Sequence, residues 1–107
     1  MDALVLPQDF DFQGAVPLWK VDLQARRISR EFIFADFSLA FEFMKQSAQC
    51  AEELDHHPDW SNSWNKVLVH LTTHSAKGLT ALDIELAQTM DILALRVNAL
   101  PLHRPLR

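Results

Sequence analysis

Residues 54–60 read Leu-Asp-His-His-Pro-Asp-Trp, and this stretch separates a helical pattern from an alternating one. A proline disfavours the helical conformation of the residue before it, so the chain must leave a helix before Pro58. Upstream, apolar residues recur at intervals of three and four, which predicts a helix that begins at Asp36 or Ser38 and ends near Leu54. Its expected buried stripe consists of Phe37, Phe41, Met44, Ala48 and Ala51.

Downstream of Pro58, residues 60–64 and 67–73 alternate between apolar and polar side chains, which predicts a β-hairpin. The pair Asn65-Lys66 suits the turn, because Asn tolerates positive φ. A turn there places residues whose numbers sum to 130 or 131 opposite one another. His74 would then lie opposite His56 or His57, so we expect three histidines to converge at the open end of the hairpin.

Two further patterned regions complete the fold. Residues 19–23 and 28–34 alternate and predict a first hairpin. Residues 80–97 predict a second helix, whose first turn holds Asp83 three residues after Thr80 in the spacing of a capping box. The apolar residues expected to face the interior are Trp19, Val21, Leu23, Ile28, Phe32 and Phe34 in the hairpin, and Leu82, Leu86, Met90, Leu93 and Val97 in the helix.

The element order is strand, strand, helix, strand, strand, helix. It indicates an α+β fold, in which a four-stranded antiparallel sheet has two to three helices packed on one face. The 107 residues fit a single domain over 1–107, with an irregular leader at 1–18 that holds at most one short helical turn, and a tail at 98–107. The exposed sheet edges of so small a protein predict self-association.

Composition narrows the functional classes. The net charge of −4, without a basic run before the last few residues, argues against direct binding to nucleic acid. No apolar run approaches the roughly 18 residues that a membrane span needs, and the start of the chain lacks a secretory signal pattern. The single cysteine, Cys50, cannot form an internal disulfide. Together these features predict a cytoplasmic protein.

The histidine cluster is the candidate for chemistry, although a histidine pair beside carboxylates also occurs as an ordinary surface feature. His70 and His74 have the helical spacing of some zinc sites, but on a strand they would lie about 13 Å apart. Two glycines in the whole chain leave no phosphate-binding loop. The remaining chemistry is proton transfer by histidine, which titrates near neutrality and requires no metal.

The motif that begins at Glu52 resembles the pterin-4a-carbinolamine dehydratase family. Glu-x-x-x-His-His-Pro at residues 52–58 is followed by Asn-Lys-Val at 65–67 and by Thr-His at 73–74, at the intervals of that family. The similarity covers about residues 19–90. It implies a four-stranded antiparallel sheet with helices on one face, assembled as a homodimer or homotetramer. The family also has a helix before Trp19, where Pro7, Gly14 and Pro17 interrupt this chain.

The resemblance implies a hydro-lyase without a cofactor. Such an enzyme dehydrates 4a-hydroxytetrahydrobiopterin to quinonoid dihydrobiopterin, in support of an aromatic amino acid hydroxylase. By resemblance, His56, His57 and His74 are catalytic. The residues implied to contact the substrate or to orient the imidazoles are Glu52, Asp55, Pro58, Thr73, Ser75, Ala76, Asp83 and Trp19.

Three alternatives stay open at this point. Asp83 also reads as a helix cap, and Trp19 as an ordinary core residue. Ser75 and Ala76 differ in type from animal members of the family, so only their backbone contacts would transfer. The alternative function is a non-enzymatic dimerisation or binding module that acts on a transcription factor or another partner protein, as animal members of the family do.

Overall fold

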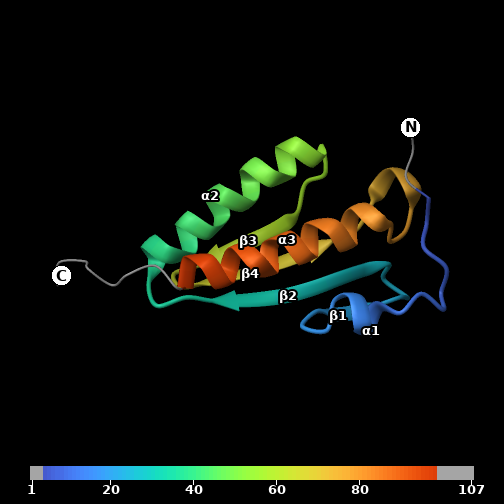
Figure 1. Cartoon of the computed structure of the whole chain (residues 1–107), viewed down its shortest axis with the longest axis horizontal. Helices are drawn as coiled ribbons and strands as arrows, with labels where there is room; N and C mark the ends of the chain where they lie inside the picture. The colour runs from blue at the N-terminus through green and yellow to red at the C-terminus, as the bar shows by residue number, and fades with distance from the viewer. Residues whose placement is uncertain (1–3, 99–107) are drawn as a thin grey trace.

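The structure, a computed structural model, describes residues 4–98. One layer is a four-stranded antiparallel sheet with the spatial strand order β1-β2-β4-β3. The second layer consists of two long helices, α2 and α3, which pack against each other on one face of the sheet (Figure 1). The predicted α+β class and its four-stranded antiparallel sheet are therefore confirmed. The elements are α1 (Phe12–Ala15), β1 (Lys20–Asp22), β2 (Arg27–Ile33), α2 (Phe37–Leu54), β3 (Asp59–Ser63), β4 (Lys66–Leu71), the 3-10 turn η1 (His74–Ala76) and α3 (Ala81–Asn98).

The core lies between the sheet and the helices. Alternate residues of β2 point into it. Ile28, Phe32 and Phe34 are at most 3% exposed, as predicted. Trp19 is buried just before β1, but Leu23 is 46% exposed, so its predicted interior position is wrong. The reason is local: β1 ends at Asp22, and Leu23 already belongs to the turn that leads to β2.

Arg30 lies on the helix-facing side of β2, where its charge is compensated. Its Nη1 is 2.5 Å from Asp91 Oδ1 on α3, and its guanidinium group lies 4.2 Å from the centre of the Phe32 ring. The indole Nε1–H of Trp19 donates to the same Asp91 oxygen at 2.9 Å. Arg30, a charged residue on an apolar strand face, is therefore paired with α3, which covers that face. Trp19 is hydrogen-bonded to the same helix.

Helix α2 follows the predicted boundaries but buries a different face. Asp36 caps it, because its Oδ1 accepts the Leu39 N–H at 2.9 Å. The predicted stripe is wrong at Phe37 and Phe41, which are 46% and 56% exposed, and Ala48 is exposed as well. The residues that α2 buries are Leu39, Ala40, Phe43, Ser47 and Ala51.

Helix α3 buries the predicted stripe. Leu86, Met90, Leu93 and Val97 lie in the core, and Leu82 is half-buried at its edge. The helix ends at Asn98, one residue into the predicted tail, and residues 99–107 of that tail lie outside the described residues. Within residues 4–98, no helix is long and apolar enough to cross a membrane.

The N-terminal segment, predicted to be an irregular leader, packs against the rest of the fold. Its predicted short helical turn is α1, in which Phe12 is buried. Val5 forms an isolated bridge with Thr80, and the Leu6 N–H donates to the Leu79 carbonyl at 2.8 Å. The segment therefore packs beside the loop that leads into α3.

The second hairpin has another register than the sequence suggested. Ser63 pairs with Lys66 and Asp59 with His70, so paired residue numbers sum to 129. The loop is Trp64-Asn65, and Trp64 rather than Asn65 takes the positive φ, of 51°. Asn65 is fixed by β2 instead, since its Nδ2 donates to the Phe34 carbonyl at 2.9 Å. The predicted turn at Asn65-Lys66 is therefore wrong, and the His74 pairing derived from it does not exist.

Candidate active site

The end of α2 delivers the histidine pair to the open end of the second hairpin. Asp55 adopts a left-handed conformation with φ 50°, and its N–H remains bonded to carbonyls of the last helical turn. The His56 N–H donates to the Ala51 carbonyl at 3.0 Å. Pro58 follows and β3 begins at Asp59. Asp55 thus acts through its backbone, as the cap that redirects the chain toward the sheet.

His56 points into a buried polar network centred on Asp83. Its Nε2 lies 2.7 Å from Asp83 Oδ1, and the histidine is 8% exposed while Asp83 is fully buried. The other carboxylate oxygen accepts the Thr73 hydroxyl at 2.8 Å and the Thr80 N–H at 2.9 Å. Because a carboxylate can only accept, His56 Nε2 carries the proton and Nδ1 remains for other contacts.

This network ties together the three segments that surround the site. Asp83 lies in the first turn of α3, His56 follows α2, and Thr73 follows β4. Asp83 acts as the helix cap and as the histidine partner at once, so the two readings of this residue are not exclusive. His57 and His74 directly follow His56 and Thr73 in the chain. The network therefore fixes the backbone next to both of the more exposed histidines.

His57 has its own carboxylate partner on the solvent side. Its Nε2 is 2.5 Å from Glu52 Oε2, and the side chains are 56% and 75% exposed. Glu52 sits in the last turn of α2, where a negative charge opposes the helix dipole. The contact with His57 explains an otherwise unfavourable placement. As with His56, the carboxylate leaves Nδ1 as the ring nitrogen available for proton exchange.

His57 and His74 line one hollow of about 170 Å³ at the open end of the hairpin. His74 starts η1, and its imidazole has no hydrogen-bond or carboxylate partner within residues 4–98. Of these two histidines, His57 is oriented by a carboxylate, and His74 is available to pair with a ligand. The full lining is Ala25, Arg27, His57, Asp59, His70, Thr72 and His74.

None of the other predicted site residues lines this hollow. His56, Asp83 and Thr73 form the buried network, and Ser75 and Ala76 continue η1 after His74. Trp19 is a core residue bonded to Asp91 and does not line the histidine hollow. Of the three histidines expected to converge, His57 and His74 line the hollow, and His56 belongs to the buried network around Asp83.

Several residues of the hollow, among them His70 and Arg27, are absent from the predicted site. His70 pairs across the strands with Asp59 on one side and Ser29 on the other, and its Nδ1 lies 2.5 Å from Ser29 Oγ. Arg27 starts β2 at the same end of the sheet. The correct hairpin register would have placed His70 beside Asp59. Among the described residues, no cluster of three or more His, Cys, Asp or Glu side chains is arranged to hold a metal ion.

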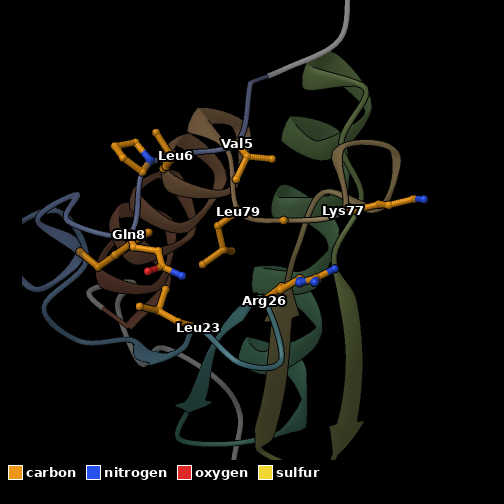
Figure 2. Close-up of a pocket in the computed structure, with 10 residues that line it drawn as sticks. Val5, Leu6, Gln8, Leu23, Arg26, Lys77 and Leu79 are labelled. Atoms are coloured by element: carbon orange, nitrogen blue, oxygen red, sulfur yellow. The ribbon is translucent and has the colours of Figure 1, made fainter.

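A separate hollow of about 130 Å³ lies on the other side of the turn between β1 and β2. Figure 2 shows Val5, Leu6 and Gln8 of the N-terminal segment facing Leu79, with Arg26 and Lys77 together at one side. Its walls are mainly apolar, and none of the histidines of the hairpin end belongs to it. It offers no group suited to proton transfer near neutrality, so the histidine hollow is the candidate active site.

Comparison with known proteins shows the family of this chain. The family described as Pterin 4 alpha carbinolamine dehydratase matches residues 8–93. A relative from Bordetella avium is 44% identical over 92 residues, covering 86% of this chain and 85% of its own length. One from Rhizorhabdus wittichii is 49% identical over 84 residues, covering 78% and 87%. Both carry the name of this dehydratase.

A solved structure extends the likeness to three dimensions. The transcriptional coactivator/pterin dehydratase from Brucella melitensis superposes with a TM-score of 0.78 at 43% identity. The match covers 84% of this chain and 98% of the Brucella chain. The histidine motif, the sheet with its two helices and both comparisons agree, and the chain belongs to the pterin-4a-carbinolamine dehydratase family.

Proposed function

We propose that the protein dehydrates 4a-hydroxytetrahydropterin to quinonoid dihydropterin by histidine acid–base catalysis. The observation that carries this proposal is that His57 and His74 line one hollow, while the adjacent His56 is held in the buried network of Asp83. Dehydration needs a proton delivered to the 4a-hydroxyl, which leaves as water, and a proton removed from ring nitrogen N5. Two imidazoles on one hollow can supply a donor and an acceptor near neutral pH.

The supporting residues have separate tasks in this proposal. Glu52 orients His57, while Asp83 holds His56 and Thr73 and thereby the backbone on both sides of the hollow. Pro58, Asp55 and the backbone of residues 73–76 would contact the substrate, as the family resemblance implies. Orienting the reacting groups in advance is a substantial part of what an active site contributes to rate.

In the cell, this activity would return the pterin cofactor of an aromatic amino acid hydroxylase to a form that a reductase can use. The protein would act as a homodimer or homotetramer, with the sheet edges or an exposed helix face as contacts.

The direct test uses the unmodified full-length protein. The 4a-carbinolamine is generated with a pterin-dependent hydroxylase, and the decay of its absorbance is followed with and without the protein, in buffer containing a metal chelator. We expect the protein to accelerate the decay and the chelator to have no effect. An unchanged decay at protein concentrations up to the micromolar range would refute the proposal.

A second candidate function is a binding module without catalysis. The Brucella protein is named a transcriptional coactivator as well as a dehydratase, and α2 here exposes Phe37 and Phe41, whose ring centres are 5.9 Å apart. Exposed paired aromatic side chains are typical of protein contact surfaces. Quenching of the tryptophan fluorescence by a pterin separates the two functions. No quenching and no turnover would favour the binding module.

A further inference from the structure

The solvent face of the sheet carries a second hollow that continues the histidine hollow. It measures about 230 Å³ and shares Arg27 and His70 with the candidate active site. The histidine hollow alone, at about 170 Å³, is smaller than the roughly 300–1,000 Å³ that ligand sites usually offer. A ligand whose reacting ring occupies the first hollow would therefore extend into the second. Its lining is Lys20, Asp22, Arg27, Ser29, Leu68 and His70.

The strand register explains why polar groups gather there. Lys20 pairs with Ser29, Ser29 with His70 and His70 with Asp59, which makes one row across all four strands. Residues directly opposite each other in a sheet point to the same face with their Cβ atoms about 5 Å apart. The row therefore leads from the histidine hollow, at Asp59, across to Lys20 at the other edge of the sheet.

His70 lines both hollows, and its ring is held in place by a hydrogen bond. Its Nδ1 is 2.5 Å from Ser29 Oγ, and both side chains are half-buried. This contact sets the ring orientation and leaves Nε2 as the nitrogen available to a ligand that lies across the boundary.

The second hollow is positively charged although the chain is acidic overall. Lys20 and Arg27 form no ion pair within residues 4–98, and Asp22 is the only acidic residue in the lining. One Asp22 oxygen already accepts the Ala25 N–H at 2.9 Å. An arginine and a lysine beside a serine hydroxyl and a histidine are a donor set suited to a phosphate group.

We propose that the second hollow binds the substituent at C6 of the pterin ring and selects pterins in which this substituent ends in a phosphate monoester. The inference rests on the proposed dehydratase function, because that function places the ring beside His57 and His74. Arg27 and Lys20 would bind the phosphate, and His70 and Ser29 the hydroxyl-bearing carbons between the phosphate and the ring.

The test compares 7,8-dihydroneopterin with its 3′-phosphate, two stable product-like pterins that differ only in the phosphate. Their dissociation constants are measured by quenching of the tryptophan fluorescence at low ionic strength. We expect the phosphate form to bind about five- to thirtyfold more tightly, the range expected for one or two partly exposed charged contacts. Added salt should reduce this ratio, because it screens exposed charges.

Lys20→Gln supplies the matched variant, since Lys20 lies only in the second hollow and is exposed. It should lower the preference for phosphate at least threefold, with unchanged affinity for neutral dihydroneopterin. Lys45→Gln makes the same charge change on the exposed surface of α2 and should leave the preference intact. A second variant, Arg27→Gln, should reduce the preference further.

Three negative results would overturn this inference, and the last of them would overturn the proposed function as well. Equal affinity of the wild-type protein for both pterins, together with measurable dehydration, would overturn this inference and leave the proposed function standing. A preference that Lys20→Gln and Lys45→Gln reduce equally would also overturn it, because the effect would then come from overall charge. Absence of both pterin binding and dehydration would overturn the proposed function and the inference with it.

Discussion

Two neighbouring histidines each meet a carboxylate at the end of the second hairpin, but in opposite surroundings. His56 and Asp83 are 9% and 0% exposed in their side chains and lie 2.7 Å apart in the interior. His57 and Glu52 are 56% and 75% exposed and lie 2.5 Å apart at the surface. Consecutive residues thus place one imidazole in the protein interior and one in the hollow.

The difference assigns the two pairs to different tasks. Leaving a buried hydrogen-bonding group without its partner costs about 1–3 kcal/mol for each group, whereas exposed pairs contribute about 0–1 kcal/mol. Asp83 also binds Thr73 and Thr80, so its loss would leave three donors unpaired. The buried pair therefore holds three segments of the chain together, and in the proposed function the exposed pair orients a reacting group.

The largest expected effect is that of Asp83→Ala. The substitution should lower the free energy of unfolding by about 3–5 kcal/mol, measured by urea denaturation, and abolish measurable dehydration. Glu85→Ala is the control, because Glu85 is exposed two residues further along α3 and should change the free energy of unfolding by less than about 0.5 kcal/mol. Equal stability of the two variants would show that the buried network is not structural.

His74→Ala should lower the dehydration rate without changing the stability of the protein. The imidazole is exposed and has no partner within the described part of the chain, so its removal should leave urea unfolding nearly unchanged. The dehydration rate should fall by about 10²–10⁴, the usual contribution of general acid–base catalysis. His57→Ala should behave alike. A His74 variant that unfolds as readily as Asp83→Ala would place this residue in the structural group instead.

Glu52→Gln should have the smallest effect. Gln keeps the size of the side chain but removes the charge that orients His57, and an exposed pair worth up to about 1 kcal/mol corresponds to a rate change of about fivefold or less. Added salt should reduce the rate of the wild-type protein toward that of the variant, since it screens the pair. A loss as large as that of His74→Ala would mean that Glu52 takes part in the chemistry itself.

The sequence predicted elements better than it predicted faces and registers. The regular spacing of large apolar residues in α3 indicated its buried face correctly. In α2, two apolar stripes compete, and the one that contains Phe37 and Phe41 is exposed, while the buried one includes the small residues Ala40 and Ser47. Small buried residues give little signal in a hydrophobicity pattern.

The family motif predicted the candidate histidines, and strand pairing adds one that the motif does not include. His57 and His74 line the same hollow, although the hairpin register from which their convergence was derived is wrong. His70 enters the site through pairing with Asp59, and that register depends on the left-handed conformation of Trp64. A tryptophan at such a position is not suggested by turn preferences, which favour Asn and Gly.

The most direct test measures the decay of the 4a-carbinolamine with three proteins at equal concentration: the wild type, His74→Ala and Glu85→Ala. Urea unfolding establishes first that all three are folded. We predict that the wild type and Glu85→Ala accelerate the decay equally and that His74→Ala is slower by about 10²–10⁴. A wild-type protein that does not accelerate the decay, or a folded His74→Ala protein that matches it, would contradict the assignment of this hollow as the dehydration site.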